Sequence, residues 1–546
     1  MDSSRYATYA PLAAILLFAT ALQAALLVRL PTVSADGIIF IRIARDLAES
    51  PIETFRSQDQ HPGYPAMLLA CARGVQWLGY RGEPDSWMAG GVVASFICGV
   101  LSVAVVWLFA RDLFDAKVAN VAAIAFTLLP VPRAGAVDAQ SDTPHALFYL
   151  LAAWMAATGI THGSLWRLGA AGLASGVAYW IRPEGLEVVL VALPLLAWHA
   201  WRAHWPWRKA SLALGTLATA ALLVAAPYPI LAGKLTSKQL PGAQQKITRA
   251  YQDFASPAAP LPNAAAAPSQ TALLVAAAPS PPAAESRYSA KVVGSLIALS
   301  LAAFINSICQ GFKFVFIPLY LLGNVALVWR RPARIQIALL AILGAAHIAI
   351  LMGVHVFSGY IAHRHVIPLV GLAMPFVGLG IVQWSLWLAP LFKTRPAYVT
   401  AATLAVCSAI VLPYTLRRLN REFLPVIEAT RWVQSRAPAG SGIVCNSPYV
   451  GFYGTLPVAE LGPAAPTLDE ALAKAPCKAQ YDYVVLHVNA HDYQPRWIDE
   501  LAHSYRQVLE LPDLYSRDKF RKVLVFQARE GRARRRLAED LGDPHG

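Results

Sequence analysis

The chain has 546 residues, of which 56% are hydrophobic and only 14% are charged. Because soluble domains carry about 25% charged residues, this composition excludes an ordinary soluble protein and indicates a membrane protein. The formal net charge is +14. The basic residues stand in short clusters between apolar runs, as in the cytoplasmic loops of membrane proteins, so nucleic acid is not an expected partner.

Apolar runs long enough to cross a bilayer as helices recur along the chain. The first, from Pro11 to Val28, lacks a convincing cleavage site and is too long for a signal-peptide core, so we expect an uncleaved span. About eleven candidate spans are predicted in all. They are 11–30, 88–110, 118–131, 144–160, 166–181, 185–200, 210–230, 312–330, 335–354, 366–388 and 397–416.

The charges of the loops predict the orientation. With the N-terminus cytoplasmic, all the basic clusters between spans fall on the cytoplasmic side, as the positive-inside rule requires. These clusters are Arg111 and Lys117, Arg167, Arg202 with Arg208 and Lys209, Arg330 with Arg331 and Arg334, and Lys393 with Arg395. We therefore expect a multi-pass protein of the inner (plasma) membrane with an extracytoplasmic C-terminal domain.

Two of the outside segments are long. The first, 31–87, contains the amphipathic stretches GIIFIRIARDLAES and YPAMLLACARGVQWLGY, which predict helices lying in the membrane interface. If the second of these stretches crossed the membrane instead, the basic clusters that follow it would lie on the outside. The other segment, 231–311, includes the Ala/Pro-rich run 253–285, predicted as a flexible loop that is either an insertion or a lid, and an apolar stretch at 291–308 that predicts another interfacial helix.

After Arg417 the composition becomes that of a soluble domain. FLPVIEATRWVQSRAP and IDELAHSYRQVLEL predict helices, whereas GIVCNSPYVGFYG, YDYVVLHV and KVLVFQA predict strands. The predicted fold class is mainly α, a polytopic transmembrane helical bundle over 1–417 followed by a small soluble α/β domain over 418–546. The six cysteines have no metal-site spacing. Cys445 and Cys477 either form a disulfide in an extracytoplasmic domain or are unrelated thiols.

Ionisable residues gather at the predicted outside ends of the helices, where such groups are usually functional. They are Asp36, Asp59 and His61, Asp138 and Asp142, Arg182 and Glu184, and His363, Arg364 and His365. Each alone has a plain alternative. Asp138 or Asp142 can cap the helix beginning near Thr143, and Arg182 can form a structural ion pair with Glu184. Their placement on one side of the membrane favours a common site.

Several short motifs resemble the GT-C glycosyltransferase superfamily, in its branch of polyprenyl-phosphate-sugar enzymes that includes protein O-mannosyltransferases and aminoarabinose transferases. They are the Asp after the first span, His-Pro-Gly-Tyr-Pro at 61–65, Ser-Asp at 141–142, Arg-Pro-Glu-Gly at 182–185, and HRHVIP at 363–368. The resemblance spans about residues 10–416 and implies roles for three residues: Asp36 as general base, His61 near the donor phosphate, and Arg364 as the late arginine of the family. The family's second acidic residue beside the Asp is replaced here by Gly37.

The resemblance implies transfer of a sugar from a polyprenyl-phosphate donor to a hydroxyl of a glycan, lipid or protein, with inversion. Asp36 would take the hydroxyl proton. The donor phosphate would bind to Arg364, Arg182 and His61, near Glu184, His363 and His365. This scheme needs no metal, although a divalent cation becomes possible if Asp36, Asp138 and Asp142 converge.

Three alternatives differ in testable ways. A transporter or flippase would need ionisable residues near the midplane of the bilayer and paired broken helices. A lipid-linked-glycan ligase would tolerate loss of Asp36. An inactive transferase-like scaffold, for which Gly37 is the best hint, would lose no activity in an Asp36→Ala variant.

Overall fold

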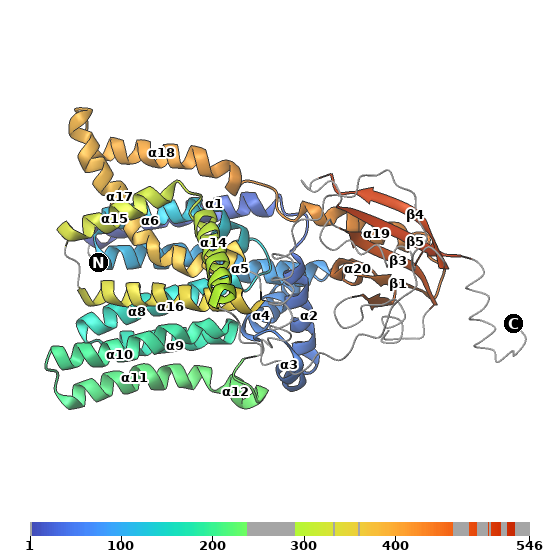
Figure 1. Ribbon diagram of the computed structural model, residues 1–546, viewed down its shortest axis with the longest axis horizontal. Helices are drawn as coiled ribbons and strands as arrows, with labels where there is room; N and C mark the ends of the chain where they lie inside the picture. The colour runs from blue at the N-terminus through green and yellow to red at the C-terminus, as the bar shows by residue number, and fades with distance from the viewer. Residues whose placement is uncertain are drawn as a thin grey trace, which may run out of the picture.

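The computed structural model describes residues 3–236, 290–330, 334–358, 361–461, 480–488, 501, 504–514 and 521–529. Figure 1 shows two parts, a bundle of long helices and a smaller region built on a β-sheet. The N-terminus lies toward the end of the bundle opposite the sheet (Figure 1). The helices that run along the bundle are α1 (Ser3–Leu27), α5 (Asp85–Leu113), α6 (Ala116–Leu128), α8 (Asp142–His162), α9 (Leu165–Ile181), α10 (Glu187–Arg202), α11 (Trp207–Ala225), α15 (Phe316–Arg330), α16 (Arg334–Ser358), α17 (Ile367–Leu391) and α18 (Pro396–Thr415). The short helix α7 (Pro130–Ala136) follows α6 at an angle.

Among the described residues, seven helices are long and apolar enough to cross a membrane, or up to nine if each of two bent pairs forms one span. One bent pair is α6 with α7, at 67°, and the other joins Ile297–Gly311 to Phe316–Leu327, at 94°. The chain is thus a multi-pass membrane protein, as predicted, although this count is lower than the predicted eleven.

The difference in count comes from α8 and α9. Both predicted ranges, 144–160 and 166–181, are helical, but α9 has only 17 residues and neither helix is among those that pass the length and hydropathy test. Most of α8 is buried, including Asp142, Thr143 and His145. A helix enclosed by its neighbours needs less apolar surface than one that faces lipid.

The first outside segment folds into α2 (Ala35–Glu49), α3 (Pro51–Ser57) and α4 (Gly63–Trp77). Ser34 caps α2 by accepting a hydrogen bond from the backbone N–H of Gly37 at 3.3 Å. In Figure 1, α2 and α14 (Ala290–Gly311) run across the direction of the bundle helices. Neither α2 nor α4, with 15 residues each, is long enough to span, which agrees with the prediction of interfacial helices.

The C-terminal sheet has the strand order β2-β1-β3-β5-β4. Its strands are β1 (Ser441–Cys445), β2 (Val458–Glu460), β3 (Gln480–Val488), β4 (Tyr505–Pro512) and β5 (Lys522–Ala528), and α19 (Leu424–Gln434) and α20 (Pro448–Tyr453) belong to the same region. β1 pairs in parallel with β2 and β3, whereas β5 pairs antiparallel with β3 and β4. A small α/β region after the last bundle helix is therefore present, as predicted.

Two local predictions in this region were wrong. The second half of IDELAHSYRQVLEL is strand β4 rather than helix, because its backbone completes the ladder along β5 and such pairing overrides weak helix propensity. The second half of GIVCNSPYVGFYG forms α20 rather than strand, with Pro448 in its first turn. Cys445 is buried, and among the described residues it forms no disulfide. Cys477 and the run 253–285 lie outside the described residues.

The sheet region and the first outside segment share one hydrophobic cluster. It joins Ile38 and Ile41 of α2 and Tyr64 of α4 to Val426 of α19 and Tyr449 of α20. Two tyrosine hydroxyls add hydrogen bonds. The Tyr449 hydroxyl donates to the carbonyl oxygen of Val33 at 2.9 Å, and the Tyr453 hydroxyl lies 2.7 Å from the Thr32 hydroxyl. The C-terminal region thereby fixes the turn from which Asp36 projects.

Candidate functional site

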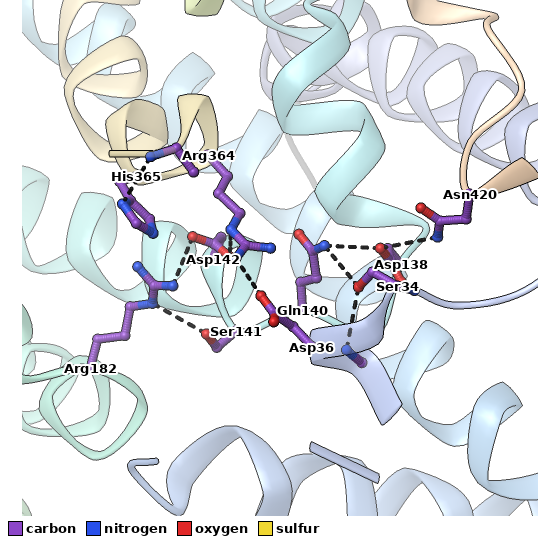
Figure 2. Close-up of polar contacts among 12 residues, drawn as sticks. Ser34, Asp36, Asp138, Gln140, Ser141, Asp142, Arg182, Arg364, His365 and Asn420 are labelled. Carbon is purple, nitrogen blue, oxygen red and sulfur yellow. Dashed lines mark hydrogen bonds and ion pairs between the residues drawn. The ribbon is translucent and has the colours of Figure 1, made fainter. Parts of the chain in front are cut away.

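Four charged residues from four separate segments meet at the end of the bundle that faces the sheet (Figure 2). Arg364 pairs with Asp36 through Nη2, and its Nε lies 3.7 Å from Oδ2 of Asp142. On the other side of Asp142, Oδ1 lies 2.9 Å from Nη2 of Arg182. Two carboxylates and two guanidinium groups therefore alternate along one network.

The ends of the helices bring these four side chains together. Asp36 lies in the first turn of α2 and Asp142 in the first turn of α8. Arg182 caps the C-terminus of α9, and Arg364 lies in the short helix η2 (His363–Val366) that leads into α17. Successive spanning helices alternate in direction, so the helix ends that flank the outside loops all lie on one side of the membrane. The sequence could therefore predict that these side chains converge.

The capping alternative for Asp142 is wrong. Helix α8 begins at Asp142 after the N-cap residue Ser141, and no side chain makes a capping hydrogen bond there. Ser141 instead accepts a hydrogen bond from Nε of Arg182 at 3.2 Å. The structural ion pair considered for Arg182 is also formed with Asp142, rather than with Glu184, which lies in the adjacent short helix η1 (Pro183–Leu186).

Asp138 belongs to a different network. Its buried carboxylate accepts hydrogen bonds from the backbone N–H groups of Ser34 and Ala139, at 2.9 and 2.8 Å, and from the side-chain amides of Gln140 and Asn420, at 2.9 and 3.4 Å. Burial raises the pKa of Asp138 above its usual range, although these hydrogen bonds act in the opposite direction. Figure 2 shows Asp138 on the far side of Gln140 from Asp142. This carboxylate connects three loops rather than joining the charged network.

His61 lies in a third cluster, among aromatic rings. Its Nδ1 is 2.9 Å from the carbonyl oxygen of Tyr179, and its ring packs on those of Tyr179 and Tyr228, with centroids 5.5 and 4.7 Å apart. Its Nε2 is 3.3 Å from the hydroxyl of Thr236. His61 is only 2% exposed, so its imidazole is enclosed by the chain rather than presented to the Asp36 network.

The two histidines that flank Arg364 differ. His363 is exposed, whereas His365 is half-buried and accepts a weak hydrogen bond from the backbone N–H of Ala362 at 3.4 Å (Figure 2). His365 also contributes to the electrostatic environment of Asp142. Both residues therefore stand beside the network, with His365 the nearer to its buried carboxylate.

Sequence reasoning missed a buried pair behind the network. Nδ1 of His347, in the middle of α16, lies 2.8 Å from Oε2 of Glu187 at the start of α10, and both side chains are at most 4% exposed. Nε2 of His347 lies 3.4 Å from the carbonyl oxygen of His365. Both ring nitrogens of His347 therefore face oxygen atoms, one of Glu187 and one of the backbone next to Arg364. The signal was present, since an ionisable residue within an apolar span indicates function.

The pair has further polar neighbours on α8. The ring of Tyr149 lies between those of His145 and His347, with centroid separations of 5.7 and 5.4 Å. Asp142, His145 and Tyr149 occupy one face of α8 at spacings of three and four residues. A column of polar side chains thus runs from the charged network into the bundle.

The carboxylates of Asp36, Asp138 and Asp142 do not converge on one point. Among the described residues, no three His, Cys, Asp or Glu side chains form a group that could hold a metal ion, because Asp138 turns away from Asp36 and Asp142. Close packing also explains why residue 37 is a glycine. A Cβ there would lie 3.1 Å from Ala139 and from Val33, so this close approach leaves little space for an acidic residue beside Asp36.

An apolar cavity opens next to the turn that carries Arg364. It has a volume of about 300 Å³ and lies between α14, α15, α16 and α17, with Phe304, Ile308, Tyr320, Ile348 and Phe376 among its lining residues. The end of α14 packs closely on η2 and α17, since a Cβ at Gly311 would lie 3.1 Å from Val366 and 3.0 Å from Val370. The cavity therefore lies next to the Arg364 turn.

Part of the chain matches a known family. Residues 85–230 match the family described as dolichyl-phosphate-mannose-protein mannosyltransferase. This range contains Asp138, Asp142, Arg182 and Glu184, whereas Asp36 and Arg364 lie outside it. A comparison with curated protein sequences found no match.

Solved structures extend the similarity to nearly the whole chain. The crystal structure of ArnT from Cupriavidus metallidurans bound to undecaprenyl phosphate is similar with a TM-score of 0.56 and 15% identity, over 94% of this chain and 97% of that chain. The apo structure of the same protein gives a TM-score of 0.54 and 14% identity, over 93% and 97%. The predicted helical-bundle fold with a small C-terminal α/β region is confirmed, and the chain shares the fold of ArnT.

Proposed function

We propose that this protein is an integral-membrane glycosyltransferase that moves a sugar from a polyprenyl-phosphate donor to an acceptor hydroxyl. The observation that carries the proposal is the network of Asp36, Arg364, Asp142 and Arg182, assembled from four segments at one end of the bundle. The mannosyltransferase family match and the ArnT-like fold support the same reaction class.

The donor phosphate is assigned to Arg364 and Arg182. A guanidinium group presents five N–H donors in a fixed plane, which suits phosphate oxygens. Asp142 holds both groups in place, because its two carboxylate oxygens face one arginine each. Positioned cations of this kind stabilise the charge that develops on the leaving phosphate without reorganisation during the reaction.

Asp36 is assigned as the general base because it is the accessible carboxylate of the network. Its side chain is 43% exposed, whereas that of Asp142 is 4% exposed and has an arginine on each side. A donor phosphate that takes the Nη edge of Arg364 displaces Asp36 from this pair. The freed carboxylate can then accept a proton from the incoming hydroxyl.

The chemical step follows from these assignments. The acceptor oxygen forms a bond to the anomeric carbon as its proton passes to Asp36. The bond between that carbon and the phosphate oxygen breaks, and its electron pair leaves on the polyprenyl phosphate held by Arg364 and Arg182. Attack opposite the phosphate inverts the anomeric centre. The step needs no metal ion, which is part of the proposal.

The apolar cavity between α14 and α17 is assigned to the first isoprene units of the donor. It lies next to the Arg364 turn and is lined mainly by apolar side chains. We place the protein in the inner membrane with its N-terminus cytoplasmic and its C-terminal region extracytoplasmic. Two features support this orientation. The N-terminus and the sheet lie at opposite ends of the bundle (Figure 1), and the basic loops follow the positive-inside rule.

The test is sugar transfer in membranes from a panel of radiolabelled polyprenyl-phosphate sugars, comparing wild type with Asp36→Asn. We expect the variant to lose about two to four orders of magnitude in rate at normal expression, because general-base help is worth that much. The matched control is Glu53→Gln, which changes an exposed carboxylate of the same outside segment and should transfer at the wild-type rate.

Two results would contradict the proposal. No transfer from any donor of the panel would indicate an inactive relative or a transporter. Equal transfer by wild type and Asp36→Asn would favour a lipid-linked-glycan ligase, which does not depend on this carboxylate.

A further inference from the structure

A second cavity lies at the opposite end of the bundle from the Asp36 network. It has a volume of about 900 Å³ and is enclosed by the start of α6, the last turns of α17 and the start of α18. Lys117, Asn120, Arg395 and Thr400 line it together with Val382 and Leu386. In Figure 1, the turn between α17 and α18 lies at the far end of the bundle from the sheet.

The cavity has a polar rim and an apolar interior. Lys117 and Arg395 stand where α6 and α18 begin, and both are exposed. Val382 and Leu386 lie further along α17, away from its end at Leu391. At a rise of about 1.5 Å per residue, the apolar lining extends roughly 7–14 Å inward from that end, which is the depth of the glycerol and upper acyl region of a leaflet.

The charge of the rim is positive. The cavity is lined by two basic side chains and one acidic one, Asp115, and the Asp115 carboxylate caps α6 by accepting the backbone N–H of Val118 at 2.9 Å. The first turn of α18, which has no side-chain cap, adds the partial positive charge of a helix N-terminus. Oδ1 of Asn120 accepts from Trp107 at 2.7 Å, which leaves its amide N–H groups as donors.

We propose that this cavity is a binding site for an anionic phospholipid, whose phosphate lies between Lys117 and Arg395 and whose acyl chain lies against Val382 and Leu386. A cationic rim at the ends of spanning helices, continuous with an apolar pocket at leaflet depth, complements a molecule with an anionic headgroup and a hydrocarbon tail. The site is remote from the transfer network, so the inference does not depend on the reaction assigned there.

The test is lipid binding by the purified full chain in detergent, measured by native mass spectrometry and by thermal unfolding. Phosphatidylglycerol is titrated against phosphatidylcholine with wild type and with the variant Lys117→Gln/Arg395→Gln. Because a basic residue near a lipid surface contributes about 1 kcal/mol, the double variant should bind phosphatidylglycerol about thirtyfold more weakly. The matched control is Arg202→Gln/Arg208→Gln, which removes two charges from the α10–α11 turn at the same end and should bind like wild type.

Several results would overturn the inference. They are equal binding of phosphatidylcholine and phosphatidylglycerol by wild type, unchanged binding by the Lys117/Arg395 variant, or an equal loss in the control. A rise in melting temperature with inorganic phosphate as large as with phosphatidylglycerol would assign the site to a free anion instead. If the double glutamine variant does not fold, Lys117→Arg/Arg395→Lys should keep the binding, and the comparison of the two lipids with wild type remains decisive.

Discussion

Asp138 and Asp142 stand four positions apart in the chain and have equal exposure, 4% each, yet the structure gives them opposite surroundings. Asp138 receives hydrogen bonds from neutral donors only, namely two backbone N–H groups and two amides. Asp142 lies between the guanidinium groups of Arg182 and Arg364. The Asp138 carboxylate connects loops, whereas the Asp142 carboxylate holds two guanidinium groups at the end of the bundle.

The difference shows how a buried acid can serve either stability or chemistry, depending on its partners. Neutral donors hold a carboxylate in place but provide no positive charge that could bind an anionic ligand. Cationic partners can each turn a second edge toward an incoming phosphate, because a guanidinium group has more N–H donors than one carboxylate uses. Variants that change one network and spare the other test this division.

The largest effect on stability is expected behind the charged network, at the pair of Glu187 and His347. His347→Leu leaves the Glu187 side chain buried without its partner, which should cost about 3–5 kcal/mol in the free energy of unfolding. Glu187→Leu/His347→Leu removes both polar side chains and should return the melting temperature to about the wild-type value. Its KM for the donor should stay about fivefold raised, because the contact with the carbonyl of His365 is lost.

The control for this pair is His355→Leu on the same helix. His355 contacts Ser300 at 2.8 Å rather than the turn of Arg364, so its loss should leave KM unchanged. A double variant with a wild-type KM would show that the pair does not position this turn.

The next effect is expected in transfer activity at Arg364. Arg364→Gln should lower kcat/KM by about 10²–10³, the usual loss when one positioned donor is removed from a developing negative charge. Arg364→Lys should recover only part of it, because an ammonium group cannot contact Asp142 and a phosphate in one plane. The control is Arg42→Gln, whose exposed pair with Glu460 contributes little. A loss below about tenfold for Arg364→Gln would place the donor phosphate elsewhere.

The two carboxylates of the comparison can then be exchanged for apolar or neutral groups. Asp138→Ala leaves four donors without their acceptor and should cost about 1–3 kcal/mol in stability, while the transfer rate per folded molecule stays within about twofold of wild type. Asp142→Asn should do the reverse, lowering kcat/KM by at least about tenfold with a smaller change in melting temperature. Equal effects of both variants on transfer would remove the distinction between the two networks.

Much of this arrangement could be predicted from the sequence. The loop charges predict the direction of each span, and that direction predicts that Asp36, Asp142, Arg182 and Arg364 lie on one side. The sequence could not separate Asp138 from Asp142, because their roles depend on Asn420 and Arg364, which arrive from distant segments. Nor could it pair Glu187 with His347, which lie 160 residues apart in the chain and each look like a lone polar residue in an apolar run.

The smallest effect is expected where the C-terminal region meets the loop of Asp36. Tyr453→Phe removes the contact with the Thr32 hydroxyl and should cost about 0.5–1.5 kcal/mol in stability, measured as a lower melting temperature in detergent. Tyr449→Phe removes the bond to Val33 and should have a similar cost, because its ring still stacks on Phe423 at 4.4 Å. If the region only supports the loop, transfer by both variants stays within about twofold of wild type. A loss of activity as large as that of Asp36→Asn would instead place this region within the reaction site.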